Sequence, residues 1–167
     1  MKIVVTNNKG FSKEQKERLD NLGDVTYYDK TPSSAEEYLK RVEGADIICS
    51  GTAGLEEAYM HLKDVHVTVD FVSVAFLDLE VMKANNVTVS NSPGINRHAV
   101  SEWIMWMITN TQRNFDNYIN LEETMRVGGT LPPILPGLAD RHITILGHGN
   151  VAIQTARLAE AYDMGNR

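Results

Sequence analysis

The chain has 167 residues, of which 43% are hydrophobic and 23% are charged, and its formal net charge is -6. This length fits one domain and part of a second, and the composition is that of a globular protein with a buried core. The acidic balance argues against nucleic-acid binding. No apolar run approaches the roughly 20 residues that cross a bilayer. We therefore expect a cytoplasmic protein that binds neither nucleic acid nor membranes.

Five short β-branched runs alternate with helical segments through the first part of the chain. The runs are Ile3–Thr6, Val25–Tyr28, Ala45–Cys49, Val65–Val69 and Val87–Ser90. Crossovers this short are right-handed and join parallel strands. The pattern therefore predicts an α/β fold, a flavodoxin-like doubly wound parallel sheet in the order 2-1-3-4-5 with helices on both faces.

Start and stop signals delimit the helices between these strands. Ser12 with Gln15, and Ser34 with Glu37, have the spacing of capping boxes. The predicted helices are Ser12–Leu22, a second that begins after Ser34 and stops at Gly44, then Leu55–Leu62, and finally Leu79–Ala84 with Asp78 as its N-cap. These helices complete the alternation of strand and helix.

A long helix is predicted at roughly His98–Met125, after the turn at Pro93 and Gly94. Its large side chains are interpreted as packing residues, with substrate contact as the alternative: Trp103, Met105, Trp106 and Met107. Glycines and prolines then predict a linker at residues 128–141.

The last segment is typical of a strand, a glycine turn and a helix, at Ile143–Leu146, Gly147–Gly149 and Asn150–Tyr162. Gly147, Gly149 and Ala152 have the spacing of the fingerprint that places a dinucleotide pyrophosphate at a helix N-terminus. The predicted cofactor contacts are Gly147, His148, Gly149, Asn150, Val151 and Ala152. An ordinary glycine-rich turn is the alternative.

Two further expectations concern this last segment. The strand Ile143–Leu146 cannot satisfy its backbone alone, so we expect it to join either the first sheet or the sheet of a partner. The acidic residue that holds the adenosine ribose lies about 20 residues beyond the glycines, near or past Arg167. The cofactor unit is therefore expected to be opened but not completed.

A family resemblance follows from four landmarks in order. Val87–Asn96, then Ala99–Glu102 and the helix to Arg113, resemble the V-x-N-x-P-G, V-A-E and R passage of the D-isomer-specific 2-hydroxyacid dehydrogenases. This family includes phosphoglycerate, glycerate and formate dehydrogenases. Leu77–Glu80 resembles its I-D-L-E segment, and residues 143–164 resemble its strand, glycine turn and helix. The resemblance covers nearly the whole chain but only about the first half of a family member.

The resemblance implies a flavodoxin-like substrate-type domain at 1–96, a long interdomain-type helix at 97–127, a linker at 128–141 and a truncated Rossmann β-α unit at 142–167. It implies oxidoreduction of 2-hydroxy acids with NAD or NADP. The family's catalytic Arg, Glu and His would lie past Arg167, so no catalytic residue is assigned. We expect a truncated or engineered chain that binds the cofactor weakly or not at all and is inactive alone.

One departure from the family concerns its glycine-containing G-V-G-Y-D loop, whose backbone N–H groups hold the substrate carboxylate. Phe71–Phe76 stands there instead. The corresponding substrate contacts are Val72 and Ser73, where the lost glycines add bulk against the carboxylate. Elsewhere, the single Cys49 is interpreted as a small buried hydrophobic residue, and no histidine pair has metal-ligand spacing, so no metal site is predicted.

Two alternatives of other classes remain. The first is a non-enzymatic flavodoxin-like binding module, although Asn7, Asn8 and Ser50 stand where a phosphoacceptor domain has its acids, and the first turn lacks the hydroxyls of a flavin-phosphate loop. The second is an oligomerisation module. An unpaired last strand and an apolar helix predict self-association, as a homodimer or by domain exchange.

Overall fold

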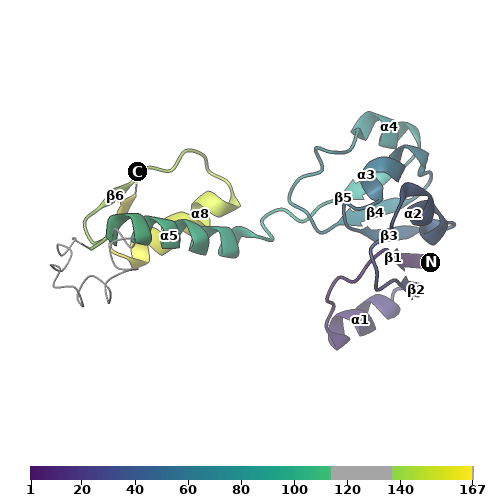
Figure 1. Cartoon of the computed structure of the whole chain (residues 1–167), viewed down its shortest axis with the longest axis horizontal. Coiled ribbons are helices and arrows are strands. Elements are labelled where there is room, and N and C mark those ends of the chain that lie inside the picture. The colour runs from purple at the N-terminus through teal and green to yellow at the C-terminus, as the bar shows by residue number, and fades with distance from the viewer. Residues whose placement is uncertain (114–136, 167) are drawn as a thin grey trace, which may run out of the picture. The chain divides into compact units, whose positions relative to one another are not determined.

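The computed structural model describes residues 1–113 and 137–166, and the chain divides into two compact units, Met1–Ile95 and Asn96–Arg167 (Figure 1). The first unit is built on five strands: β1 (Lys2–Val5), β2 (Asp24–Tyr27), β3 (Ile47–Ser50), β4 (His66–Val69) and β5 (Thr88–Ser90). All neighbouring strands are parallel, and their order is β2-β1-β3-β4-β5. The predicted fold class and strand order are confirmed.

The helices of this unit divide between the two faces of the sheet. Figure 1 shows α1 (Lys13–Asp20) on one face, and α2 (Ala35–Val42), α3 (Leu55–Ala58) and α4 (Leu79–Ala84) on the other. Right-handed crossovers require this, because the β1-to-β2 connection runs across the sheet in the opposite direction from the later ones. The predicted helix Leu55–Leu62 is split into α3 and the 3-10 turn η1 (Tyr59–His61).

The core lies between the sheet and α2, α3 and α4. Val4, Ile48 and Val67 are fully buried on this face. They alternate along their strands with residues of the other face, because successive strand residues point to opposite sides. Tyr38 of α2 is buried among them, and its hydroxyl donates to Ser50 Oγ at 2.9 Å. Burial raises the pKa of Tyr38 to about 12. The phenol therefore remains a neutral donor inside the core.

The side chains on the α1 face of the sheet change from apolar at β1 to polar at β4 and β5. Ile3 and Val5 of β1 are buried, whereas the face is polar at β4 and β5. There the ring nitrogens of His66 lie 2.7 Å from Thr88 Oγ1 and 3.1 Å from Ser90 Oγ. These side chains satisfy one another across the two strands.

The predicted N-caps are present with one difference. Ser12 and Gln15 form the expected capping box at α1, with each side chain bonded to the other residue's backbone N–H. At α2, Ser34 Oγ accepts from Glu37 N at 3.1 Å as expected. The Glu37 carboxylate, however, accepts from the backbone and hydroxyl of Ser33 at 2.8 and 2.6 Å, one residue earlier than a capping box requires.

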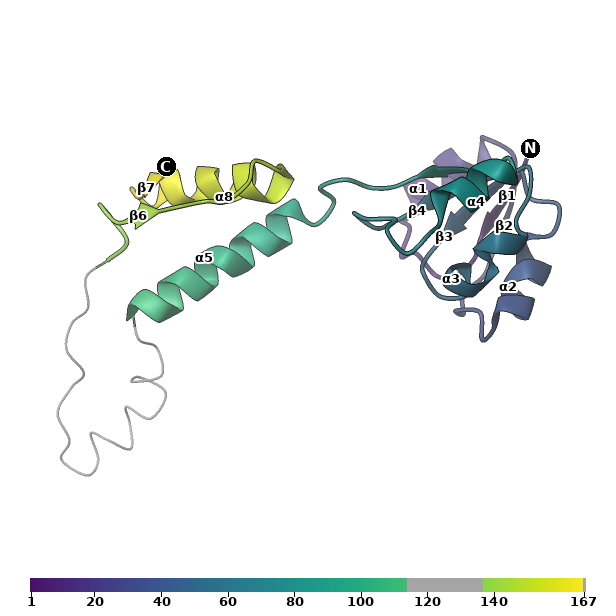
Figure 2. The ribbon, with the colours of Figure 1, turned by 90° about the horizontal axis from the view of Figure 1, so that it is seen from above.

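The second unit pairs two helices. Figure 2 shows α5 (Arg97–Arg113) and α8 (Asn150–Ala161) side by side, with β6 (His142–Ile143) and β7 (Gly165–Asn166) at one end. Ser101 is fully buried between the helices, and its hydroxyl lies 2.6 Å from Arg97 O and 3.2 Å from Val151 O. The apolar core of the unit is Met105, Leu138, Ala159 and Met164.

The strand predicted at Ile143–Leu146 is shorter than expected. It covers only His142–Ile143, and among the described residues it pairs in parallel with β7. A two-residue strand such as β7 can satisfy the backbone hydrogen bonds of only a short neighbouring strand. Leu146 lies beyond that pairing and is 96% exposed. The rest of the predicted long helix, 114–125, and most of the linker, 128–136, lie outside the described residues.

The interpretation of the large α5 side chains as packing residues is correct for Met105 but wrong for three others. Trp103, Trp106 and Met107 are 50%, 58% and 43% exposed. The buried side of α5 is a narrow stripe through Ser101 and Met105, and the two tryptophans lie off that stripe. Their rings contact each other edge to face, with centroids 5.3 Å apart.

A pH-dependent contribution to stability is expected from Glu37. Hydrogen bonds from Ser33, followed by one from Arg41, lower its pKa from 4.5 to about 2. A carboxylate whose pKa falls on folding stabilises the fold above its unfolded pKa, and loses this effect as the pH falls through the folded value. Glu37→Gln should therefore lower the melting temperature at pH 7, with the difference vanishing toward pH 2, as measured by circular dichroism. Glu36→Gln, in an exposed pair with Lys40, is the control and should show little change.

Candidate functional site

The glycine turn connects β6 to α8. Gly147 has a φ of +111°, a conformation that side chains disfavour. Gly149 is the N-cap of α8 and has an ordinary φ of -90°. A Cβ added at Gly149 would meet no atom within 4 Å. Neither backbone conformation nor packing against the described residues therefore requires glycine at position 149, and the space in front of it is open.

The helix behind this turn presents backbone donors. Asn150, Val151 and Ala152 form the first turn of the 12-residue α8, and no side chain caps them. The N–H groups at a helix N-terminus lack partners within the helix and carry a partial positive charge. The structure thus brings the six predicted contact residues together at one helix start, with His148 exposed beside it.

A hollow of about 470 Å³ lies next to the turn, within the second unit. Gly147, His148 and Ala152 line it together with Arg157 and Glu160. Sequence reasoning missed Arg157. Its place four residues after Ile153, which also lines the hollow, is the helical spacing that could have identified it. An exposed guanidinium is the side chain best shaped for phosphate oxygens.

The second predicted contact pair, Val72 and Ser73, lies in the loop between β4 and α4 of the first unit, and both residues are exposed. The carbonyl of Val72 accepts from Asn91 Nδ2 at 2.7 Å, and Ser73 Oγ accepts from Ala75 N at 3.2 Å. Ser92 N donates to the neighbouring carbonyl of Phe71 at 2.9 Å. The loop is thus tied to the segment after β5, and its backbone is held without glycine.

An ion pair between a buried lysine and a partly exposed aspartate at the carboxyl-terminal edge of the sheet was not predicted. Lys9 follows β1 and Asp70 follows β4, and their side chains meet at 2.9 Å across the end of β3. A Cβ added at Gly51, just after β3, would stand 3.3 Å from Lys9 Nζ. Glycine at position 51 therefore leaves room for the lysine side chain to cross the end of the strand.

This pair borders a hollow of about 520 Å³. The loop after β1, the ends of β3 and β4 and the segment after β5 contribute its walls, which include Cys49 and Ser92. In parallel α/β sheets, ligands bind beyond the carboxyl ends of the strands. The hollow lies at the edge where the fold favours a ligand.

Cys49 is half-buried in this wall and has no disulfide partner. Burial raises the pKa of its thiol, and the charge of Lys9 opposes that shift in part. The neutral thiol therefore dominates near pH 7, which agrees with the interpretation of Cys49 as a small packing residue rather than a nucleophile.

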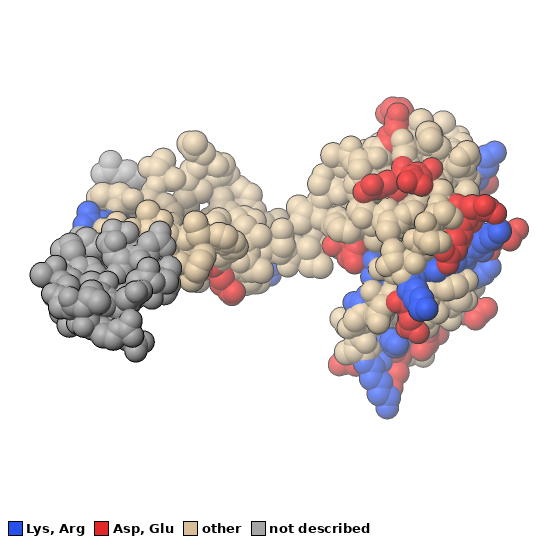
Figure 3. All heavy atoms as spheres, in the orientation of Figure 1, with Lys and Arg blue, Asp and Glu red and all other residues tan. Residues whose placement is uncertain are grey.

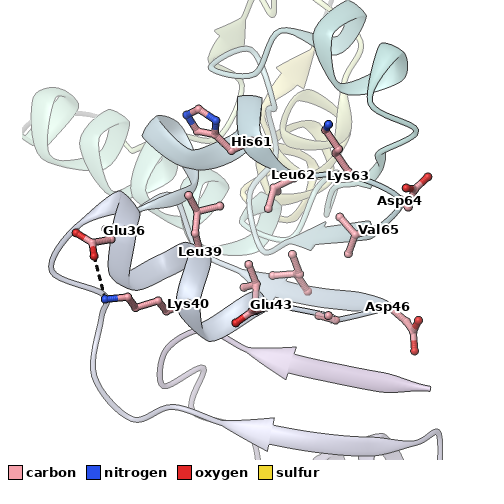
Figure 4. Close-up of a pocket in the computed structure, with 14 residues that line it drawn as sticks. Glu36, Leu39, Lys40, Glu43, Asp46, His61, Leu62, Lys63, Asp64 and Val65 are labelled. Carbon is pink, nitrogen blue, oxygen red and sulfur yellow. Dashed lines mark ion pairs between the residues drawn. The ribbon is translucent and has the colours of Figure 1, made fainter.

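A larger hollow of about 630 Å³ lies at the opposite, amino-terminal edge, between α2 and η1 (Figure 4). Several of its charged side chains take part in local ion pairs or hydrogen bonds. Glu36 pairs with Lys40 at 2.9 Å, and Asp46 accepts from the backbone of Lys2 at 2.6 Å. Asp64 accepts from an asparagine amide at 2.8 Å. We therefore assign the functional edge by strand direction rather than by size.

Within residues 1–113 and 137–166, no three His, Cys, Asp or Glu side chains are grouped as metal ligands. No helix in these ranges combines the length and apolar character needed to span a bilayer.

Comparison with known proteins identifies relatives at the level of family and fold. The sequence model described as "D-isomer specific 2-hydroxyacid dehydrogenase, catalytic domain" matches residues 3–160. No curated protein sequence matches the chain.

Solved structures with a similar fold include an acyclic imino acid reductase in complex with NADPH and D-Arg, at 22% identity and a TM-score of 0.79. A glyoxylate reductase from Paecilomyes thermophila has 16% identity and a TM-score of 0.72. A 3-phosphoglycerate dehydrogenase from Entamoeba histolytica, bound to NAD+, has 23% identity and a TM-score of 0.66. These matches cover 98%, 99% and 100% of this chain but only 54%, 54% and 53% of the solved chains. The chain thus spans about half the length of its structural neighbours.

The reactivity of Cys49 tests whether its thiol is buried beside Lys9 in the wall of the 520 Å³ hollow. Because burial raises its pKa, alkylation by iodoacetamide at pH 8 should be at least about tenfold slower in the folded chain than in urea. Lys9→Met should slow the reaction further, since it removes the charge that favours the thiolate. Mass spectrometry follows the labelling, with Lys40→Met as the control, and equal rates in folded and unfolded chain would contradict this account.

Proposed function

The chain belongs to the D-isomer specific 2-hydroxyacid dehydrogenase family, and we propose that it provides the substrate-type domain and phosphate-binding turn of an NAD(P)-dependent oxidoreductase of 2-hydroxy acids. In this proposal residues 1–96 are the substrate-type domain, 97–127 the interdomain helix, 128–141 the linker and 142–167 the opening of the cofactor domain. Having a single cysteine, the chain is suited to the reducing cytoplasm.

Gly149 carries the cofactor part of the proposal. Its φ of -90° suits any residue, and an added Cβ would meet no atom of the described residues within 4 Å. A glycine that neither conformation nor packing requires is accounted for by a ligand whose backbone approach needs the space. A pyrophosphate meets this description, because the donors of Asn150 and Val151 stand behind the opening.

The roles of the protein groups follow from their positions. The N–H groups at the start of α8 would hold the pyrophosphate, and Arg157 would add a cation beside it. The backbone at Val72 and Ser73 would take the substrate carboxylate. The nicotinamide, when bound, supplies the group that accepts or gives a hydride.

Turnover needs further groups, namely one that takes the alcohol proton and a cation that orients the carboxylate. His66 is engaged with Thr88 and Ser90. His142 lies in β6, and His148 lies at the phosphate turn. We assign none of these three histidines as the group that takes the alcohol proton. We therefore propose that the 167-residue polypeptide by itself does not catalyse the reaction.

Titration with NADH tests the proposal. Amide resonances of residues 147–152 should shift at millimolar NADH, with a dissociation constant of about 1 mM or weaker. Gly149→Val should abolish these shifts, because its side chain fills the opening. The matched control is Gly137→Val, where an added Cβ would meet, among the described residues, only Arg113, at 3.9 Å.

An activity assay completes this test. The chain should not reduce NAD or NADP with any 2-hydroxy acid, and turnover on the order of 1 s⁻¹, an ordinary enzymatic rate, would contradict the proposed inactivity. Shifts that persist in Gly149→Val would contradict the assigned cofactor turn.

Self-association is the second candidate function, as a homodimer or an oligomerisation module. The observation that favours it is the contact pair Trp103 and Trp106, half exposed together with Met107 on one side of α5. Uncharged atoms dominate the face of α5 and α8 visible in Figure 3, whereas charges of both signs cover the first unit. Aromatic anchors of this kind are enriched at the centres of protein interfaces.

Light scattering distinguishes the states. At micromolar concentration the chain should have a dimeric or larger mass, and Trp106→Glu should reduce it to the monomer by placing a charge in the contact. Leu22→Glu alters a residue that is 61% exposed in the first unit and should leave the mass unchanged. A monomeric unmodified chain would exclude this role for α5.

A further inference from the structure

The hollow at the carboxyl-terminal edge of the first unit is lined by an incompletely satisfied cation. The side chain of Lys9 is only 6% exposed, and its ammonium has three N–H donors. Its one hydrogen bond within the described part of the chain is to Asp70 Oδ2. A buried charge is costly unless its donors are paired. Two donors of a nearly buried ammonium that borders a hollow therefore indicate an acceptor supplied by a ligand.

Asp70 provides the complementary group. Its side chain is 47% exposed, and Lys9 engages one of its two oxygens. The other oxygen can accept from a ligand. Of the residues that line the hollow, Lys9 and Asp70 are the charged ones, so the lining has no net charge.

This charge arrangement discriminates between classes of ligand. A simple carboxylate would satisfy Lys9 but would place a second negative charge beside Asp70, and a simple amine would oppose Lys9. A zwitterion satisfies both, with its carboxylate on the ammonium of Lys9 and its own ammonium on the free oxygen of Asp70. The site then remains neutral when the ligand is bound.

The dimensions and walls also suit a small zwitterion. A volume of about 520 Å³ lies within the range of small-molecule pockets. Phe11, Val69 and Ile95 supply apolar surface near the charged pair. We propose that this hollow binds a free α-amino acid through Lys9 and Asp70. The site is contained in Met1–Ile95 and needs no nucleotide, so it stands or falls independently of the proposed redox function.

Binding of three small probes to the full chain, without nucleotide, tests the proposal. Alanine carries both charges, lactate lacks the ammonium and ethylamine lacks the carboxylate. By calorimetry and amide shifts near residues 9 and 70, alanine should bind at least about tenfold more tightly than either of the others. Lactate binding as tightly as alanine, or no binding of alanine at millimolar concentrations, would overturn the proposal.

Two substitutions provide a readout that a structural role would not produce. Asp70→Asn keeps the shape but removes the negative charge, so alanine should bind about tenfold more weakly and lactate more tightly than to the unmodified chain. Lys9→Met should weaken both ligands by at least about tenfold. An Asp70→Asn variant that is folded by circular dichroism and keeps the original preference would overturn the proposal, even if Lys9→Met fails to fold.

The matched control is Lys40→Met. Lys40 also pairs with a carboxylate at 2.9 Å, that of Glu36, but its side chain is 74% exposed and lies away from the carboxyl-terminal edge. This variant should bind alanine and lactate as the unmodified chain does. A loss equal to that of Lys9→Met would show that general charge, rather than the site, determines binding.

Discussion

The right-handed connection of parallel strands is the constraint on which the first unit depends. It fixes the order β2-β1-β3-β4-β5 and directs all five carboxyl ends to one edge. Residues that are remote in sequence are then brought together, as Lys9 and Asp70 are across a separation of 61 positions. The polar groups at that edge lie close together because all five strands run in the same direction. At the amino-terminal edge, by contrast, Glu36 and Lys40 in the wall of the 630 Å³ hollow pair with each other.

Much of the fold could be predicted because the signals are local. β-Branched runs, cap residues and stop glycines each act within a few positions, and the helix α4 and its cap Asp78 were predicted to the residue. The second unit was predicted less well. A strand's length depends on its neighbour, so Ile143–Leu146 could not be judged without knowing that β7 offers two residues. The exposure of Trp106 likewise depends on which stripe of α5 meets α8, and hydrophobicity alone does not identify that stripe.

In the candidate site too, the features set by local sequence could be predicted and those set by tertiary structure could not. The glycine turn could be predicted from the spacing of its glycines, and the structure adds that the positive φ of Gly147 accounts for one of them. Lys9 was not predictable by motif, since a lysine in a turn after a strand is ordinarily solvated. Its burial arises from three separate segments: the turn after β1, the carboxylate after β4, and a glycine after β3 with room for the side chain. Only the strand order, combined with a search for charged residues after each strand, could have placed Lys9 beside Asp70.

The two glycines nearest the proposed sites differ in what occupies the space beside them. At Gly51, an added Cβ would crowd Lys9 Nζ at 3.3 Å, so the chain's own side chain accounts for the glycine. At Gly149, an added Cβ would meet nothing, so the described protein does not account for it. The space at Gly51 is therefore used by a buried cation, whereas the space at Gly149 is open to the cofactor that we propose. That proposal draws on the family to which the chain belongs, and the ligand proposed at Lys9 and Asp70 draws on the charges of those two residues.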